Sequence, residues 1–169
     1  MKNVIILGAG LIGKTMAIDL AAKYKVTCAD IRQESLNDFP PRLKISTTVC
    51  DFTHKKKLAG LLQPFDLVIL AIPGFMGFDT LKTVIEAGKN VVDISFFPED
   101  PFKLNELAVK KNVAAIVDCG VAPGMCNIIA VLSIMSEFCP VVFLHLVQGN
   151  AFFNPEDIPH APGFSLPEL

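Results

Sequence analysis

A run of apolar residues that ends in a glycine-rich turn constrains this chain more than any other feature. The segment VIILGAGLIG at residues 4–13 reads as a buried strand, a tight turn and the start of a helix. Gly8 permits the turn, Gly10 lets the backbone approach a ligand, and Gly13 lets the helix pack close to the sheet. The first turn of such a helix offers unpaired N–H groups and a partial positive charge, which favour an anion. The segment therefore predicts the pyrophosphate site of a dinucleotide.

An acidic residue follows the second predicted strand, at residues 26–29. The carboxylate of Asp30 would accept hydrogen bonds from the adenosine ribose hydroxyls and would repel a 2′-phosphate. Ile31 and Arg32 come next, and a guanidinium at position 32 could reach such a phosphate. We therefore predict NAD as the cofactor, with NADP as the less favoured alternative.

Strand-length apolar runs alternate with helix-length segments along most of the chain. This order predicts parallel βαβ units in a doubly wound (Rossmann) α/β sheet with helices on both faces. The expected strands span residues 4–7, 26–29, 44–49, 67–72, 90–94 and 113–117. The expected helices span residues 11–24, 58–62, 78–87, 102–110 and about 123–137.

The C-terminal part differs from this pattern. One β-rich run occupies residues 141–147, and a proline-rich stretch without periodicity follows it. We place the nucleotide-binding domain at residues 1–138. Residues 139–169 read as the truncated and largely extended start of a second α+β domain.

Composition and charge exclude several classes of function. A net charge of −2 gives no electrostatic footprint for nucleic acid. No apolar stretch reaches the roughly 20 residues that cross a bilayer. The five cysteines show neither metal-ligand spacing nor a disulfide framework. We therefore expect a soluble cytoplasmic protein that binds no nucleic acid, no membrane and no metal.

Ligands of open parallel sheets bind beyond the carboxyl ends of the strands, so the residues after each predicted strand are candidates. Asp51 and Phe52 would border the adenine, or would be a plain turn residue and a buried aromatic. Asp93 and Ser95 would contact substrate or nicotinamide, or would only cap the next segment. Ala71, Ile72, Pro73 and Gly74 would leave bare backbone at the nicotinamide-ribose half, or would form a plain strand-to-helix turn.

A second glycine loop, CGVAPG at residues 119–124, leads into the last predicted helix. A proline at a helix start is a common structural signal, but two glycines at the ligand edge suggest that a ligand approaches the backbone. We expect Cys119, Gly120 and Val121 at the cofactor and Pro123 and Gly124 at the substrate. No histidine is evidently paired with the cysteine, and no catalytic residue is identified.

Taken together, these motifs resemble the saccharopine dehydrogenase family, with the closest likeness to its lysine 6-dehydrogenase-like and saccharopine reductase-like branch. The resemblance covers about residues 1–150, and its most discriminating piece is GVAPGMCN, because generic dinucleotide-binding domains lack it. The matching segments are GAGLIG, ADIR, CDFT at 50–53, AIPGFMG at 71–77, EAGKNVVDIS at 86–95 and DCGVAPGMCN at 118–127.

The resemblance implies NAD(P)-linked oxidation of an amine on an amino acid, or the reverse reduction, with hydride passing to or from C4 of nicotinamide. It also implies roles for particular residues: Gly8, Gly10, Leu11, Ile12 and Gly13 at the pyrophosphate, Asp30 at the ribose, Asp51 and Phe52 at the adenine, and Ala71, Pro73 and residues 119–124 at the nicotinamide end. Members of the family carry a large second domain that supplies much of the substrate pocket and the subunit contacts. We therefore expect an amino-acid substrate, a homo-oligomer, and a chain that is incomplete for catalysis by itself.

Two other functions remain open. Regulatory nucleotide-binding domains of potassium transport systems share the opening glycine turn and the acid after the second strand. AIPGFMG and GVAPGMCN speak against such a non-catalytic NAD-binding module, which does not need them. An interaction domain that keeps the fold but has lost the ligand is the third possibility.

Overall fold

Six strands form one parallel sheet in the order β3-β2-β1-β4-β5-β6 in the computed structural model, which describes residues 1–37 and 39–129. The order reverses between β1 and β4, as in a doubly wound sheet, so the predicted fold class is confirmed. The strands are β1 (Asn3–Leu7), β2 (Lys25–Asp30), β3 (Ile45–Val49), β4 (Leu67–Leu70), β5 (Asn90–Asp93) and β6 (Ala115–Ile116).

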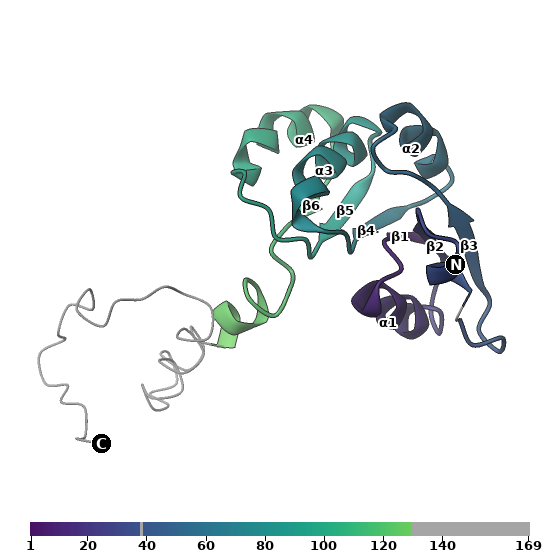
Figure 1. Cartoon of the computed structure of the whole chain (residues 1–169). Coiled ribbons are helices and arrows are strands. Elements are labelled where there is room, and N and C mark those ends of the chain that lie inside the picture. The colour runs from purple at the N-terminus through teal and green to yellow at the C-terminus, as the bar shows by residue number, and fades with distance from the viewer. Residues whose placement is uncertain (38, 130–169) are drawn as a thin grey trace, which may run out of the picture. The chain divides into compact units, whose positions relative to one another are not determined.

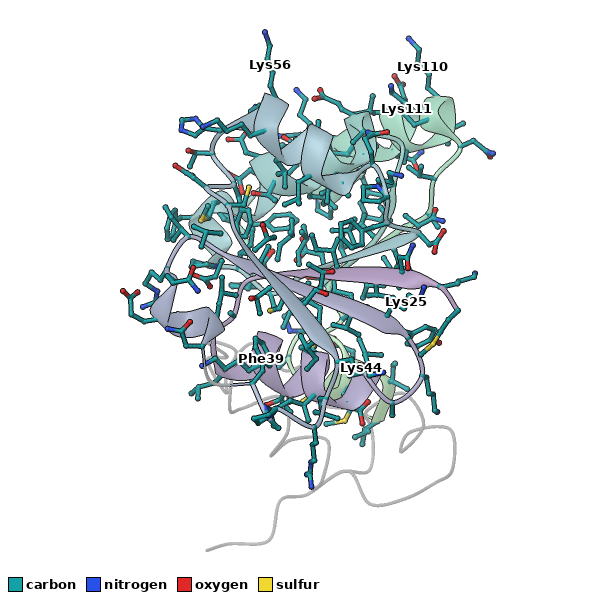
Figure 2. The ribbon with its side chains drawn as sticks, turned by 90° about the vertical axis from the view of Figure 1, so that its right-hand side faces the viewer. Lys25, Phe39, Lys44, Lys56, Lys110 and Lys111 are labelled. Atoms are coloured by element: carbon teal, nitrogen blue, oxygen red, sulfur yellow. The ribbon has the colours of Figure 1, made fainter. Side chains whose placement is uncertain are left out.

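Helices cover both faces of this sheet. In Figure 1, α1 lies on one face and α2, α3 and α4 lie on the other. Figure 2 shows Lys56, Lys110 and Lys111 pointing outward from the second helical layer. The α-helices are α1 (Leu11–Leu20), α2 (Lys55–Leu62), α3 (Gly77–Glu86) and α4 (Asn105–Lys111), and the 3-10 turns are η1 (Glu34–Leu36), η2 (Gly74–Met76) and η3 (Pro101–Leu104).

The core consists of one apolar cluster on each face, because successive side chains of a strand point to opposite sides. On β1, Ile5 and Leu7 pack with the helices α2 and α3. Val4 and Ile6, the residues that alternate with them, pack on the face that carries α1. Burial on both faces explains why the strands read as continuous apolar runs.

Several boundaries differ from the sequence prediction. The first helix ends at Leu20 rather than at residue 24, and the segment expected as one helix at 102–110 is divided into η3 and α4. The N–H of Phe102 donates to Asp100 Oδ1 at 2.9 Å, and this bond caps the start of η3. Gly88 follows the C-cap of α3 with a φ of +72°, a backbone conformation that residues with a side chain rarely adopt.

The chain divides into two compact units, Met1–Gly120 and Val121–Leu169. The expected boundary at residue 138 and the β-rich run at 141–147 lie outside the described residues, so both stay predictions. Among the helices within the described ranges, none has both the length and the apolar character needed to cross a membrane.

Candidate functional site

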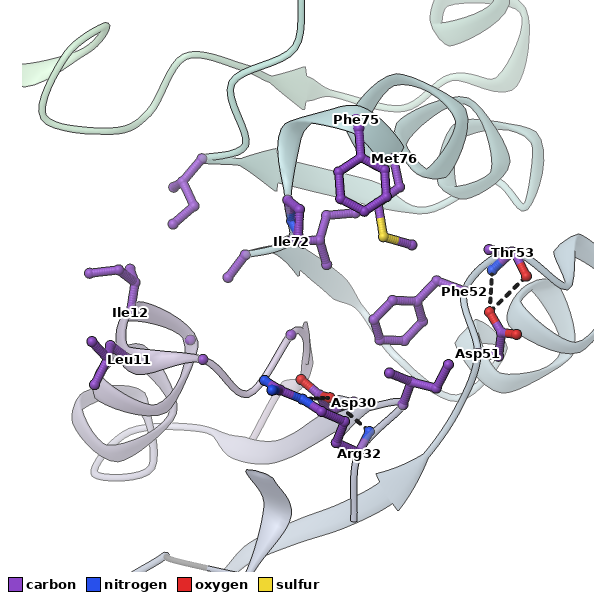
Figure 3. Close-up of a pocket in the computed structure, with 17 residues that line it drawn as sticks. Leu11, Ile12, Asp30, Arg32, Asp51, Phe52, Thr53, Ile72, Phe75 and Met76 are labelled. Carbon is purple, nitrogen blue, oxygen red and sulfur yellow. Dashed lines mark hydrogen bonds and ion pairs between the residues drawn. The ribbon is translucent and has the colours of Figure 1, made fainter. Parts of the chain in front are cut away.

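A cleft of about 810 Å³ opens at the carboxyl ends of the strands (Figure 3). This volume lies within the range of roughly 300–1,000 Å³ that is typical of ligand sites. Thirteen of its lining residues were predicted as cofactor contacts: Gly8, Gly10, Leu11, Ile12, Gly13, Asp30, Ile31, Arg32, Asp51, Phe52, Ala71, Ile72 and Pro73. The fold thus brings together candidates that lie more than sixty positions apart in the sequence.

The three glycines of the turn have different surroundings. Gly8 has a φ of +107°, and a Cβ there would collide with the carbonyl oxygen of Ala71. A Cβ at Gly13 would collide with the carbonyl oxygen of Gly8. A Cβ at Gly10 would meet no atom within 4 Å. The fold therefore explains the first and third glycines, but not Gly10, which lines the cleft.

The N-terminus of α1 also borders the cleft. Gly10 is its N-cap residue, and no side chain caps the helix or places an acid in its first turn. The first intrahelical bond is donated by the N–H of Lys14 to the carbonyl of Gly10, at 2.9 Å. Because earlier N–H groups have no such partner within the helix, this end suits an anion.

Asp30 is held at the end of β2 by backbone bonds. Its Oδ2 accepts the N–H of Ala9 at 2.8 Å, and its Oδ1 accepts the N–H of Arg32 at 2.9 Å. The Nε of Arg32 lies 3.8 Å from the same Oδ1. The carboxylate is almost buried and the guanidinium side chain is mostly exposed, with 11% and 68% of their respective surfaces accessible. A rigid acceptor and an adaptable cation therefore share this part of the cleft.

The residues after β3 form a local turn. Asp51 Oδ1 accepts the N–H of Thr53 at 2.9 Å and its hydroxyl at 2.7 Å, and these bonds, the hydroxyl first, hold the pKa of Asp51 below its ordinary value. The N-cap residue of α2 is His54, which makes no side-chain capping bond. Figure 3 shows the ring of Phe52 pointing into the cleft, although most of that side chain is buried.

Apolar residues surround the part of the cleft beyond β4 and β5. Ala71, Ile72 and Pro73 line the cleft after β4, and Phe75 stands 87% exposed. Four lining residues were not predicted: Thr53, Phe75, Met76 and Ile94. Each lies within the segments CDFT, AIPGFMG or VVDIS, so the motifs already contained them.

Asp93 and Ser95 do not line the cleft. Asp93 is 0% exposed, and its Oδ1 accepts the N–H of Ser95 at 2.6 Å and its hydroxyl at 2.5 Å. Oδ2 has no hydrogen-bond partner among the described residues. Burial raises the pKa of this carboxyl to about 6, against the lowering effect of the Ser95 bonds, and Asp118 adds a further increase.

The second glycine loop is divided between the two units. The N–H of Cys119 donates to the carbonyl of Asp93 at 3.2 Å, and neither Cys119 nor Gly120 is among the residues that line the cleft. Val121, Pro123 and Gly124 belong to the second unit, within which the N–H of Gly124 donates to Asn127 Oδ1 at 2.9 Å. Their roles at cofactor and substrate stay predictions. Over residues 1–37 and 39–129, no three His, Cys, Asp or Glu side chains gather as metal ligands would.

Comparison with known proteins gives a family match. Residues 4–116 match the model of a family described as the saccharopine dehydrogenase NADP binding domain. Among solved structures, the chain is similar to saccharopine dehydrogenase (L-Glu forming) from Saccharomyces cerevisiae, with a TM-score of 0.71 and 27% identity over 80% of this chain and 31% of the other.

Two further structures share the fold at lower identity. A putative oxidoreductase, YvaA, from Bacillus subtilis has a TM-score of 0.53 and 24% identity, over 69% of this chain and 34% of its own. GenD2 from gentamicin A biosynthesis, solved with NAD, has a TM-score of 0.53 and 22% identity, over 71% of this chain and 34% of its own. The chain thus spans about a third of the length of each of these structures.

Proposed function

This chain belongs to the saccharopine dehydrogenase NADP-binding domain family, and on that premise we propose that it is the NAD-binding part of an amino-acid oxidoreductase. Membership makes it an NAD(P)-binding Rossmann domain. The choice of NAD, the amino-acid substrate and the hydride transfer between an amine carbon and nicotinamide are the proposal.

One observation carries the proposal for the cleft, namely the open space at Gly10. A glycine in the middle of a turn normally has a conformational or steric reason to be there. Gly10 has an ordinary φ of −70° and no neighbour within 4 Å of a Cβ. A pyrophosphate against the bare backbone and the uncapped end of α1 would supply the missing reason.

The order of the strands supports a course for the dinucleotide. With the pyrophosphate at the end of β1, the neighbouring β2 offers Asp30 to the adenosine ribose, and β3 beyond it offers Asp51 and Phe52 to the adenine. The nicotinamide falls on the other side, at the ends of β4 and β5. There Pro73 and Ile94 line the cleft.

Asp30 supports NAD rather than NADP. Two backbone N–H groups fix its carboxylate, and a 2′-phosphate at that ribose would bring a second anion against it. Arg32 works in the other direction, since its exposed guanidinium could pair with a phosphate. We give more weight to the nearly buried carboxylate held by two backbone bonds than to the exposed cation, and so propose NAD.

We do not expect this chain to catalyse the reaction by itself. The titratable residues that line the cleft within the described ranges are Asp30, Arg32 and Asp51, all in the adenosine half. Residues of the nicotinamide half are apolar there, so they offer no group that could move a proton. The aligned part of this chain makes up only about a third of each solved relative, and we propose that the proton-transfer groups come from a region corresponding to the unmatched remainder of those relatives.

The lack of titratable residues along the described nicotinamide half also favours a second candidate, a non-catalytic NAD-binding regulatory module. A sensor needs the cofactor cleft but no proton-transfer group. Family membership weighs against it, because the matched description names a dehydrogenase domain. Amine-dependent NAD reduction by a longer form that includes the chain would favour the oxidoreductase, and NAD binding without turnover would favour the module.

The nucleotide preference is tested by titrating the 169-residue chain with NADH and NADPH and recording nicotinamide fluorescence. We expect tighter binding of NADH, by about tenfold, and a loss of this preference in Asp30→Ala. Arg32→Ala should weaken NADPH more than NADH. Tighter NADPH binding by the unmodified chain would overturn the preference while leaving the dinucleotide site intact. Substrate class and homo-oligomerisation remain part of the proposal.

A further inference from the structure

The buried carboxylate of Asp93 ends β5, one residue before Ile94, which lines the cleft. We propose that Asp93 is a positioning residue that fixes the wall of the nicotinamide half through Ser95. This inference rests on the proposed function, because that function decides which half of the cleft receives the nicotinamide.

The setting of Asp93 is unusual for a residue that only closes a turn. A carboxylate without solvent exposure is costly to bury unless each oxygen is paired. Here Oδ1 accepts two bonds from Ser95, whereas Oδ2 has no partner among the described residues. Burial correspondingly raises the pKa of the group to about 6. An asparagine could accept the same two bonds without the charge, so the positioning role depends on the acceptor for Ser95 and not on the charge.

Ser95 stands between this carboxylate and the start of α3. A Cβ at Gly77, the first residue of α3, would lie 2.5 Å from Ser95 Oγ and 2.7 Å from the ring of Phe97. The space there is filled, so the hydroxyl of Ser95 has Asp93 on one side and α3 on the other. A shift of Ser95 would therefore be transmitted to the helix start.

A second close contact joins the same two loops. A Cβ at Gly74 would collide with the carbonyl oxygen of Phe96, so the turn after β4 lies directly against the segment after β5. The N–H of Ile94 also donates to the carbonyl of Leu70, the last residue of β4, at 3.1 Å. Pro73, Phe75 and Met76 line the cleft from this turn, as Figure 3 shows for the latter two.

These contacts form one connected path. Asp93 holds Ser95, Ser95 and Phe96 lie against the glycines of the turn after β4, and that turn carries lining residues of the nicotinamide half. The adenosine half is built on β1, β2 and β3 and shares none of these contacts. Loss of Asp93 should consequently affect one half of the cofactor and leave the other half in place.

The test compares two ligands that differ in the nicotinamide half. NADH occupies both halves, whereas ADP-ribose retains the adenosine, pyrophosphate and second ribose but lacks the nicotinamide ring. We expect Asp93→Ala to weaken NADH about tenfold, to reduce the fluorescence enhancement of the bound nicotinamide, and to change ADP-ribose affinity less than about twofold. Asp93→Asn, which keeps the acceptor for Ser95, should restore NADH binding to within about threefold.

A matched control is Asp66→Ala. Asp66 also accepts a backbone N–H, from Asn3 at 2.7 Å, but at the amino end of the sheet. The Asp66→Ala substitution should leave the affinities for NADH and ADP-ribose unchanged. If Asp93→Ala does not fold, Ser95→Ala removes only one of the two bonds and should give the same selective loss, about threefold in size.

The possible results of these titrations distinguish the positioning role of Asp93 from the proposed NAD-binding function. Equal weakening of NADH and ADP-ribose in a folded Asp93→Ala or Ser95→Ala chain would overturn the positioning role, and so would unchanged NADH affinity. Unmodified chain that binds neither ligand would overturn the proposed function, and the inference with it. Selective loss of NADH affinity, with rescue by Asp93→Asn, would support both.

Discussion

At the scale of single residues, the glycine turn contains positions where packing excludes a side chain and a position where it does not. Gly13 belongs to the first kind, since a Cβ there would collide with the carbonyl of Gly8. Gly10 belongs to the second. The two glycines read alike in the sequence motif, and only the surrounding backbone distinguishes them.

Asp30→Ala tests the ribose assignment. Removal of the carboxylate takes away the acceptor for the adenosine ribose and frees the N–H groups of Ala9 and Arg32. We expect NADH affinity to fall at least tenfold, because a hydrogen bond to a charged group contributes about 1.5–3 kcal/mol. Calorimetric titration measures this change, with Asp66→Ala as the control. Unchanged affinity would show that the ribose lies elsewhere.

Asp93 should make the stability of the domain depend on pH. Its pKa is raised by burial from 3.8 to about 6, so the folded state binds the proton more tightly than the unfolded state. The stabilisation from protonation is full below pH 3.8 and is lost as the pH rises through about 6. Relative to Asp93→Asn, the unmodified chain should therefore gain about 1 kcal/mol on going from pH 7 to pH 5. Urea unfolding of both chains at the two pH values measures this difference in the free energy of unfolding. The same pH dependence in both chains would contradict a raised pKa at Asp93.

At the scale of elements, the sequence predicted the order and the type of the strands and helices better than their ends. Alternating apolar runs identified all six strands, because burial on both faces leaves a signal that needs no tertiary information. The strand expected at residues 67–72 ends at Leu70, and the last one shrinks to Ala115–Ile116. The end of a strand depends on how far it pairs with its neighbouring strand, and the sequence of one segment does not specify that pairing.

The C-terminus of α3 offers a test at this scale. Gly88 follows the cap residue with a φ of +72°, its N–H donates to Ile85, and the N–H of Lys89 donates to Val84 at 3.2 Å. A Cβ on Gly88 would meet no atom within 4 Å, so only backbone strain opposes a side chain. Gly88→Ala should lower the free energy of unfolding by roughly 1 kcal/mol without changing NADH affinity. A more stable variant would contradict the left-handed cap.

The cleft shows the same division between what was predictable and what was not. The rule that ligands bind beyond the strand ends selected Asp30, Asp51 and Pro73, since each lies at the carboxyl end of a strand or within three residues of it. It also selected Asp93 and Ser95, which lie at the end of β5 but are buried, do not line the cleft and bond to each other. Strand-end position is readable from sequence, but the direction of a side chain after the strand depends on the adjacent loop.

At the scale of the whole molecule, the chain spans about a third of the length of its solved relatives. We expect no substantial lysine- or saccharopine-dependent reduction of NAD by the 169-residue chain, because the described nicotinamide half holds no titratable side chain. Absorbance at the wavelength of reduced nicotinamide measures this. Sustained turnover would contradict the proposal that the proton-transfer groups belong to a region corresponding to the part of the solved relatives that this chain does not match.

The central claim is that a dinucleotide lies against Gly10 in this cleft, and the most direct measurement is NADH titration of the unmodified chain and of Gly10→Ala. The added methyl group has free space in the protein, so the variant should stay folded, with a loss of no more than about 1 kcal/mol at the helix cap. The account predicts saturable NADH binding by the unmodified chain and at least a tenfold loss in Gly10→Ala. Equal NADH affinity of the two folded chains, or no saturable binding at millimolar NADH, would contradict it.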